Sequence, residues 1–284
     1  MSETAFDDYL AQWRGGNPQR MVAWLFLRPG ERACFGALAA LEHEWLKVLR
    51  EAREPQVAAA RLGWWREEMQ RAPQGQARHP LTQGLFTMPR ASAVPAACWT
   101  APVEAAMALL VAPPPADFAA QRAAAQPLAD ALSELEARVW FGDGVASARA
   151  AKVTLLASLV SNLRALESMA ERGRSPLPMN LLARHALTID ALGSASPARP
   201  RRAAVRDYAA DLQRELTGAA RMQGPLTLFR AVGLQHDLDT LDLALRADEP
   251  LAALRSSAFG LRGLLKTWRA ARTWRNRLPI ESHP

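Results

Sequence analysis

The sequence is poor in several residue types, and each shortage excludes a class of protein. Two cysteines, Cys34 and Cys98, occur in 284 residues, too few for the disulfide framework of a small secreted domain. The amino terminus, MSETAFDDYL, lacks the basic and apolar regions of a secretory signal. No apolar run reaches the ~18 residues that a membrane-spanning helix needs. We therefore expect a cytoplasmic protein, with peripheral attachment to the inner face of the membrane as the further option.

Strand-like alternation is also absent, and helical periodicity takes its place. Apolar residues recur at spacings of three and four along nearly the whole chain, which is typical of amphipathic helices. The pattern predicts an all-α bundle, folded as a single domain over residues 1–284. The segment 193–202 is interpreted as a connection inside that bundle. Helices are expected near 18–27, 30–50, 54–71, 100–112, 117–140, 145–172, 203–221, 225–246 and 250–276.

Lysine is scarce, so arginine carries nearly all of the positive charge. The formal net charge is +7 and the sequence pI is about 10.3, which favours anionic partners such as phosphate groups or acidic lipid. The charge is dense near the carboxyl terminus, where a basic amphipathic helix is expected at about 250–277. Its residues 255–277 include no acid and suit an anionic membrane surface. The other interpretation is a last bundle helix with a solvated basic face, which is the usual amphipathic pattern. Nucleic acid is not expected as a partner, because no recognition motif accompanies the charge.

Two acidic or histidine-containing stretches resemble metal motifs only superficially. The stretch HDLDTLD contains Asp237, Asp239 and Asp242, and we interpret it as a solvated helix face. The stretch EHEW lacks the second histidine one turn away that a zinc protease requires. His43 is therefore interpreted as a surface or bridging side chain.

Three segments of the sequence, taken together, resemble one family of enzymes. They are WLFLRPGERACFGALAALEHEWLKVLREAREPQVAAARLGWWREEMQR, the HPL at 79–81, and NLRALESMAERGRSPLP. Their arginines, tryptophans and Gly-Arg corner are similar to those of the squalene/phytoene synthase family, over about residues 18–187. The RLGWWREEM stretch is the most specific part of the match.

The resemblance implies an all-α isoprenoid-synthase fold around a central cavity. Members of the family condense two prenyl diphosphates head to head, using two Asp-rich helices that face each other across the cavity. Carboxylates one turn apart suit this chemistry, because bridging Mg²⁺ ions neutralise the departing diphosphate and bind hard oxygen ligands. One branch, which includes a mitochondrial respiratory complex I assembly factor, lacks the full set of aspartates.

This sequence departs from the family pattern at both Asp-rich motifs. Ala165 and Met169 stand at the two aspartate positions of the second motif, and Leu46, Lys47 and Arg50 stand at the acidic positions of the first. We therefore expect no metal site and no catalytic residue. Three glutamates could be displaced replacements: Glu44 and Glu51, seven residues apart on one helix face, and Glu167.

The arginines of the family pattern are retained. The matching positions are Arg32, Arg61, Arg164, Arg172 and Arg174. Arginine forks suit phosphate oxygens, so a cavity without metal ligands could still hold an anionic head group. These arginines could equally form structural ion pairs with Glu44, Glu67, Glu68 or Glu167.

Two functions follow from the resemblance and its departures. The favoured one is a protein without catalytic Mg²⁺ activity that binds an isoprenoid or lipid-like small molecule, or acts in assembly with a protein partner, and needs no cofactor. The alternative is an active prenyltransferase of the squalene or phytoene type, using Mg²⁺ and the displaced carboxylates.

Overall fold

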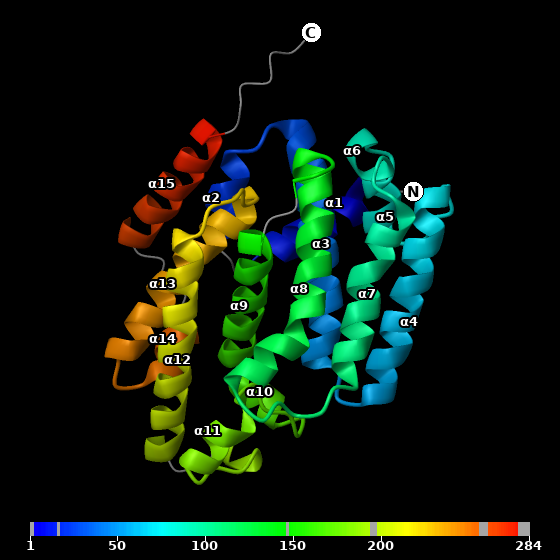
Figure 1. The fold of residues 1–284 in the computed structure, drawn as a ribbon. Coiled ribbons are helices and arrows are strands. Elements are labelled where there is room, and N and C mark those ends of the chain that lie inside the picture. Colours follow the sequence, from blue (N-terminus) through cyan, green and yellow to red (C-terminus); the bar gives the residue numbers. More distant parts are fainter. Residues whose placement is uncertain (1–2, 16–17, 146–147, 194–197, 256–260, 278–284) are drawn as a thin grey trace.

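The computed structural model describes residues 3–15, 18–145, 148–193, 198–255 and 261–277, and within them the chain forms helices and no strand (Figure 1). The helices that form the body of the bundle are α3 (Pro29–Glu51), α4 (Pro55–Arg71), α7 (Ala96–Leu110), α8 (Phe118–Phe141), α9 (Ala148–Arg164), α12 (Ala198–Arg221), α13 (Leu228–Arg246) and α15 (Leu261–Arg277). The shorter ones are α1 (Glu3–Arg14), α2 (Pro18–Leu25), α5 (Pro80–Leu85), α6 (Pro89–Ser92), α10 (Leu166–Ala170), α11 (Met179–Arg184) and α14 (Pro250–Arg255), with 3₁₀ turns at Ala72–Gln74 and Asp190–Leu192. The predicted all-α fold is confirmed.

Local sequence signals set many of the helix boundaries. Proline is the first residue of α2, α3, α4, α5, α6 and α14, where its missing N–H costs nothing and its fixed φ favours the helix. Side-chain oxygens cap two longer helices: Asp117 Oδ1 accepts from Ala120 N at 2.8 Å at the start of α8, and Thr227 Oγ1 accepts from Arg230 N at 3.4 Å at the start of α13. Helix α8 ends at Gly142, whose φ of 87° disfavours other residues.

Two expected helices differ from the observed ones. The single helix expected near 145–172 is divided into α9 and α10 at Ala165, whose N–H is shared between the carbonyls of Ser161 and Asn162. The helix expected near 250–276 is divided into α14 and α15, and residues 256–260 between them lie outside the described residues. Helices α1, α5, α6 and α11 were not predicted from the sequence.

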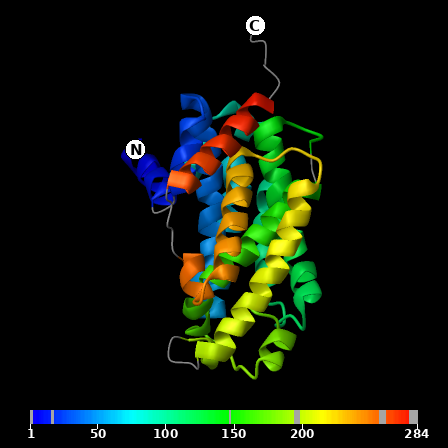
Figure 2. The same ribbon diagram turned by 90° about the vertical axis from the view of Figure 1, so that its left-hand side faces the viewer.

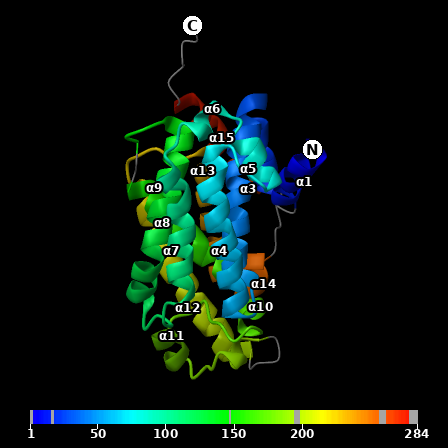
Figure 3. The same cartoon turned by 90° about the vertical axis from the view of Figure 1, so that its right-hand side faces the viewer.

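The long helices pack side by side in an order that follows the chain. Helix α4 packs on α7, α7 on α8, α8 on α9, α9 on α12, and α12 on α13. Figure 3 shows α4 and α7 together beside α3. Helix α15 packs on α13 and α2 and crosses the bundle obliquely (Figure 2). No helix within the described ranges has both the length and the apolar character required to traverse a bilayer.

The buried apolar residues form two clusters that meet at α8 and α13. Leu132 and Leu135 of α8 belong to a cluster with α1 to α7, whereas Ala125 and Ala129 of the same helix belong to a cluster with α9 to α14. Helix α13 is shared in the same way. The space between the two clusters holds the cavity that forms the candidate site.

Candidate functional site

A cavity of about 250 Å³ lies in the middle of the bundle. Its walls come from α2, α3, α8, α9 and α13, with Leu109 of α7 and Trp13 of α1. Part of the wall is apolar, from residues that include Leu128, Leu132 and Val153. The rest is strongly polar, so the cavity combines a surface for an aliphatic group with charged side chains.

The first-motif positions on α3 face this cavity without supplying an acid. Leu46 and Arg50 line it. They share one helix face with His43, which also lines the cavity, because these residues are spaced three and four apart. The interpretation of His43 as a surface or bridging side chain is therefore wrong: its ring is partly buried and has no hydrogen-bond partner among the described residues.

Arg20, His43 and Arg50 form a cationic cluster on one side of the cavity, which we call the α2–α3 cluster. Nη1 of Arg20 donates to the carbonyl of Trp13 at 2.5 Å, and its guanidinium lies 5.0 Å from the Trp13 ring centroid. Burial, and then the charges of Arg50 and Arg230, lower the pKa of Arg20 to about 10. Arg50 itself has a lowered pKa, chiefly through burial.

His43 is uncharged at neutral pH in this cluster. Burial lowers its pKa to about 4, and the charges of Arg20, Arg50 and Lys47 act in the same direction. Positive charge is thus concentrated around the positions that the resemblance assigns to the first Asp-rich motif.

A second polar group joins three helices at the cavity, through Arg230 of α13. Its Nη2 donates to Glu42 Oε2 at 2.6 Å, and its Nε donates to Glu136 Oε2 at 2.9 Å. Burial and the neighbouring Glu136 raise the pKa of Glu42 well above its usual range, against the opposing effect of the Arg230 charge. Oε1 of Glu42 is buried and makes no hydrogen bond.

Arg164 and Asp237 form a third polar group. Nη2 of Arg164 on α9 donates to Asp237 Oδ1 on α13 at 2.8 Å, and both residues line the cavity. Asp237 is only 4% exposed, so the interpretation of HDLDTLD as a solvated face is wrong for this residue. The spacing of Asp237 from Leu234 and Leu241, both buried, is the sequence signal that places it inside.

The other two acids of that stretch lie on the surface. Asp239 pairs with Lys266 at 2.6 Å, and Asp242 pairs with Arg246 at 2.8 Å. Both carboxylates are partly or largely exposed.

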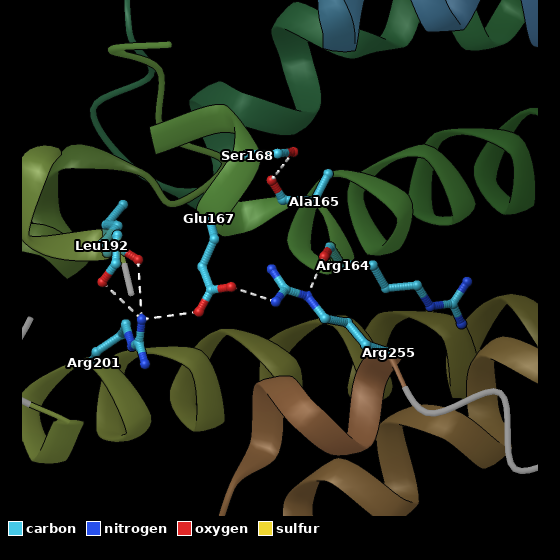
Figure 4. A network of polar contacts seen from close by, with 8 residues as sticks. Arg164, Ala165, Glu167, Ser168, Leu192, Arg201 and Arg255 are labelled. Carbon is cyan, nitrogen blue, oxygen red and sulfur yellow. Dashed lines mark hydrogen bonds and ion pairs between the residues drawn. The ribbon is translucent and has the colours of Figure 1, made fainter. Parts of the chain in front are cut away.

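The displaced glutamates do not gather at the cavity. Glu167 lies between Arg201, at 3.0 Å, and Arg255 (Figure 4). Glu44 is partly buried and is not among the lining residues, and Glu51 is exposed at the end of α3. No group of three or more histidine, cysteine, aspartate or glutamate side chains with metal-binding proximity exists in the described part of the chain.

The second-motif positions are also unsuited to a metal. Ala165 stands at the break between α9 and α10, and Met169 is buried at 5% exposure. Neither residue lines the cavity. In Figure 4 the Arg164 side chain extends away from Glu167, and Arg164 is a residue of the cavity wall.

Of the five family-matching arginines, Arg164 lines the cavity. Three others bind backbone carbonyls: Arg32 donates to Trp24 at 3.1 Å, Arg172 to Ser168 at 2.6 Å, and Arg174 to Leu49. Arg61 is exposed on α4. Arg174 thereby ties the segment after α10 to the end of α3, directly beside Arg50.

Sequence reasoning missed several cavity residues. They are Arg20, Glu42, Glu136 and Arg230, all of which line the cavity. The signal for Glu42 was present, because it falls among Leu38, Leu41 and Trp45, which are all buried on the same helix. A charged residue inside an apolar helical stripe indicates a buried partner or a ligand.

The charges of the cavity favour anions over cations. Four arginines line it, Arg20, Arg50, Arg164 and Arg230, against three carboxylates, Glu42, Glu136 and Asp237. Each of those carboxylates is ion-paired with an arginine. Arg50 makes no hydrogen bond or ion pair among the described residues.

Comparisons with known proteins agree with this architecture. A solved dehydrosqualene synthase in complex with a ligand has a TM-score of 0.70 at 10% identity, over 97% of this chain and 98% of its own. A squalene synthase, HpnC from Alicyclobacillus acidocaldarius, has a TM-score of 0.52 at 16% identity, over 96% of this chain and 94% of its own. These likenesses show the fold, and a search of curated protein sequences gave no match.

The sequence itself shows the family. The family model described as squalene/phytoene synthase matches residues 14–237, which include α2 to α12 and the first half of α13. That span contains all of the charged residues of the cavity. The chain therefore belongs to the squalene/phytoene synthase family.

Proposed function

We propose that this protein binds an anionic isoprenoid or lipid-like molecule in its central cavity and does not perform Mg²⁺-dependent prenyl transfer. One observation carries the proposal: every carboxylate that lines the cavity is ion-paired with an arginine, and the first-motif positions that line it are Leu46 and Arg50, which carry no carboxylate. A metal would have to compete with those arginines for the carboxylates.

The chemistry of the family's reaction explains why this matters. A departing diphosphate needs its developing charge neutralised, and bridging Mg²⁺ ions held by carboxylates supply several kcal/mol of that stabilisation. Mg²⁺ also demands near-octahedral oxygen coordination, which paired carboxylates on three different helices do not offer. Arginines alone stabilise a bound anion without assembling the metal cluster.

The size of the cavity points in the same direction. Its volume of about 250 Å³ lies just below the ~300–1,000 Å³ of typical ligand pockets. Such a space suits one chain of modest length better than the two substrates of a head-to-head condensation. Two solved proteins that share the fold are named as squalene-type synthases, one with a bound ligand, which supports an isoprenoid-like ligand here.

A turnover assay separates this proposal from the alternative, a prenyltransferase that uses displaced carboxylates. Purified protein is mixed with farnesyl or geranylgeranyl diphosphate, Mg²⁺ and a nicotinamide cofactor, and released diphosphate is measured. We expect none above the protein-free control. Turnover that is abolished by Glu44→Ala or Glu167→Ala would establish the prenyltransferase instead.

The outer surface of α2 and α15 supports a peripheral membrane role. Leu264, Leu265 and Trp268 of α15 are 42%, 46% and 40% exposed, and Met21 and Leu25 of α2 are 49% and 72% exposed. The Phe26 ring centroid lies 6.5 Å from that of Trp268 and connects the two helices. We call this the α2–α15 surface, and it includes the exposed Arg272, whose guanidinium lies 5.1 Å from the Trp268 ring centroid.

Helix α15 also packs as the last helix of the bundle. Thr267, Ala271 and Trp274 are buried, and Trp274 Nε1 donates to the Leu226 carbonyl at 2.7 Å. The two interpretations of the carboxyl-terminal segment are therefore compatible, because different faces of one helix serve them. Exposed leucine and tryptophan beside arginine suit an anionic bilayer, so we propose that the α2–α15 surface rests on one.

A further inference from the structure

We infer that the α2–α3 cluster of Arg20, His43 and Arg50 is a metal-independent binding site for the phosphate or diphosphate head group of a short-chain lipid. The inference rests on the proposed function, since it places the head group of the same cavity ligand. It goes further by naming the residues and by replacing the metal with protein cations.

The three side chains converge from two helices. Arg20 comes from α2, and His43 and Arg50 come from successive turns of one face of α3. Arg20 is held in place by the carbonyl and the ring of Trp13. His43 and Arg50 make no hydrogen bond or ion pair with the residues that the structure describes, so their donors remain available to a ligand.

Electrostatics make the cluster unfavourable without an anion. Burial and mutual repulsion lower the pKa of Arg20 to about 10 and that of His43 to about 4. Lys47 adds to the positive potential at His43. A bound anion would relieve this repulsion, because its negative charge lies among the positive ones.

The nearby acids are already engaged. Glu42 and Glu136 bind Arg230, and Asp237 binds Arg164. Glu51, whose charge acts on Arg50, is exposed at the end of α3. An incoming oxyanion therefore replaces no existing ion pair of Arg50.

The donor set selects the ligand class. Guanidinium groups bind phosphate oxygens in a bidentate manner, and a neutral imidazole adds one donor or acceptor. Arg50 stands at a position where the family has an acid, so the sign of the charge is reversed: the oxyanion contacts the protein directly rather than through Mg²⁺. Leu128 and Leu132 of α8 and Val153 of α9, on the walls of the same cavity, provide the surface for an aliphatic tail.

Calorimetric titration in excess EDTA tests the inference, with geranyl diphosphate, geraniol and inorganic pyrophosphate as probes. We expect geranyl diphosphate to bind more tightly than either of the others, and added Mg²⁺ to leave its affinity unchanged. Arg50→Gln should lower the affinity for geranyl diphosphate by roughly tenfold or more, since it removes charge-assisted hydrogen bonds. The affinity for geraniol should not change. Arg53→Gln, at an exposed position three residues away, is the matched control and should change neither.

The possible outcomes distinguish this inference from the proposed function. If geraniol and geranyl diphosphate bind equally and Arg50→Gln alters neither, the head-group site is refuted while the cavity remains a binding site. The same holds if geranyl diphosphate binds only with Mg²⁺. If no probe binds, both proposals fail. If pyrophosphate binds as tightly as geranyl diphosphate, the anion site stands but the lipid ligand does not.

A second measurement avoids dependence on one variant. In the unmodified protein, raising the salt concentration from about 0.1 M to about 0.5 M should lower the affinity for geranyl diphosphate, because salt screens charge. The affinity for geraniol should not fall. Equal salt responses for the two probes would overturn the inference. Arg20→Gln should reproduce the loss seen with Arg50→Gln.

Discussion

Arg164 of α9 and Asp237 of α13 lie 2.8 Å apart where two helices meet at the cavity. Arg164 is one of the arginines that the family pattern retains, whereas Asp237 comes from a stretch that resembles a surface acidic motif. Because of this pairing, the Asp237 carboxylate neutralises Arg164 and is not free to bind a metal ion. We therefore interpret the pair as a structural element of the site.

Removing Asp237 should destabilise the protein. Asp237→Ala leaves Arg164 partly buried without its carboxylate, and we expect a loss of about 1–3 kcal/mol of unfolding free energy, below the full range for a fully buried pair because Arg164 is partly exposed. Urea unfolding measures it. The control is Asp242→Ala, which breaks an exposed pair with Arg246 and should cost under about 0.5 kcal/mol. Equal losses in the two variants would contradict the structural role of Asp237.

The Glu42–Arg230–Glu136 group should respond to pH in a defined direction. The pKa of Glu42 is raised in the folded protein, so the folded state binds more protons than the unfolded state, and stability falls as pH rises above the unfolded value of ~4.3. Glu42→Gln cannot ionise and should flatten this fall. Unfolding measured at pH 5 and pH 8 tests it: a slope that Glu42→Gln leaves unchanged would contradict the assignment.

Arg230 is expected to be the least replaceable residue of that group. Arg230→Ala leaves two carboxylates 7% and 5% exposed without their cation, at a cost of about 3–5 kcal/mol. Arg230→Ala combined with Glu42→Gln and Glu136→Gln should recover part of the loss, because no unpaired charge then stays buried. Thermal unfolding of the single and triple variants decides this; no recovery in the triple variant would argue against a charge-driven loss.

Ligand affinity should rise as pH falls, through His43. The pKa of His43 is about 4 in the free protein, and a bound oxyanion raises it, so protonation strengthens binding as pH falls through the bound-state value. Arg20, Arg50 and Lys47 act on it directly. The other titratable or charged groups of the cavity wall are Glu42, Glu136, Arg164, Arg230, Asp237 and His236.

The measurement is the affinity for geranyl diphosphate between pH 8 and pH 6. His43→Gln should remove the pH dependence, and His236→Gln is the control that separates the two rings, since the pKa of His236 is also lowered by burial. If the pH dependence of affinity persists in His43→Gln and is lost in His236→Gln, it arises from His236 and the prediction for His43 is wrong.

Binding to anionic vesicles tests the α2–α15 surface. Leu265→Glu adds a charge at a position 46% exposed and should reduce co-sedimentation with vesicles that contain phosphatidylserine, since it removes apolar contact and repels the anionic surface. Leu243→Glu, at a position 48% exposed on α13, is the matched control and should bind as before. If both variants lose vesicle binding equally, net charge alone explains the binding and the α2–α15 surface is not the contact site.

Point substitution is preferable to deletion of the carboxyl-terminal helix. Trp274 and Ala271 are buried, so removing residues 261–284 would expose the core that they cover. A loss of vesicle binding after that deletion would therefore reflect folding as much as contact with lipid.

The sequence predicted the helical fold because helical periodicity depends on local spacing and because the family resemblance extends over most of the chain. It did not predict the ion pairs of Arg230, because Glu42, Glu136 and Arg230 come from three helices, each residue 94 positions from the next along the chain. Short helices such as α5 and α11 were missed, since a six-residue segment is too short to show helical periodicity.

The α2–α3 cluster shows the same limit. His43 and Arg50 are recognisable as one helix face, but their proximity to Arg20 depends on how α2 packs beside α3. The turn after α10 was predicted only in part. The sequence indicated the Gly-Arg corner, and Gly173 has a φ of 69° that disfavours other residues. What Arg174 binds there, the Leu49 carbonyl, required the fold.

The central claim is that protein cations hold the ligand's head group where relatives use a metal. A crystal structure of the protein grown with geranyl diphosphate and Mn²⁺, with anomalous data collected at the manganese edge, tests it most directly. The account predicts a head group in contact with Arg20 and Arg50 and no anomalous peak in the cavity. A manganese ion bound between α3 and α9 through carboxylate side chains would contradict it.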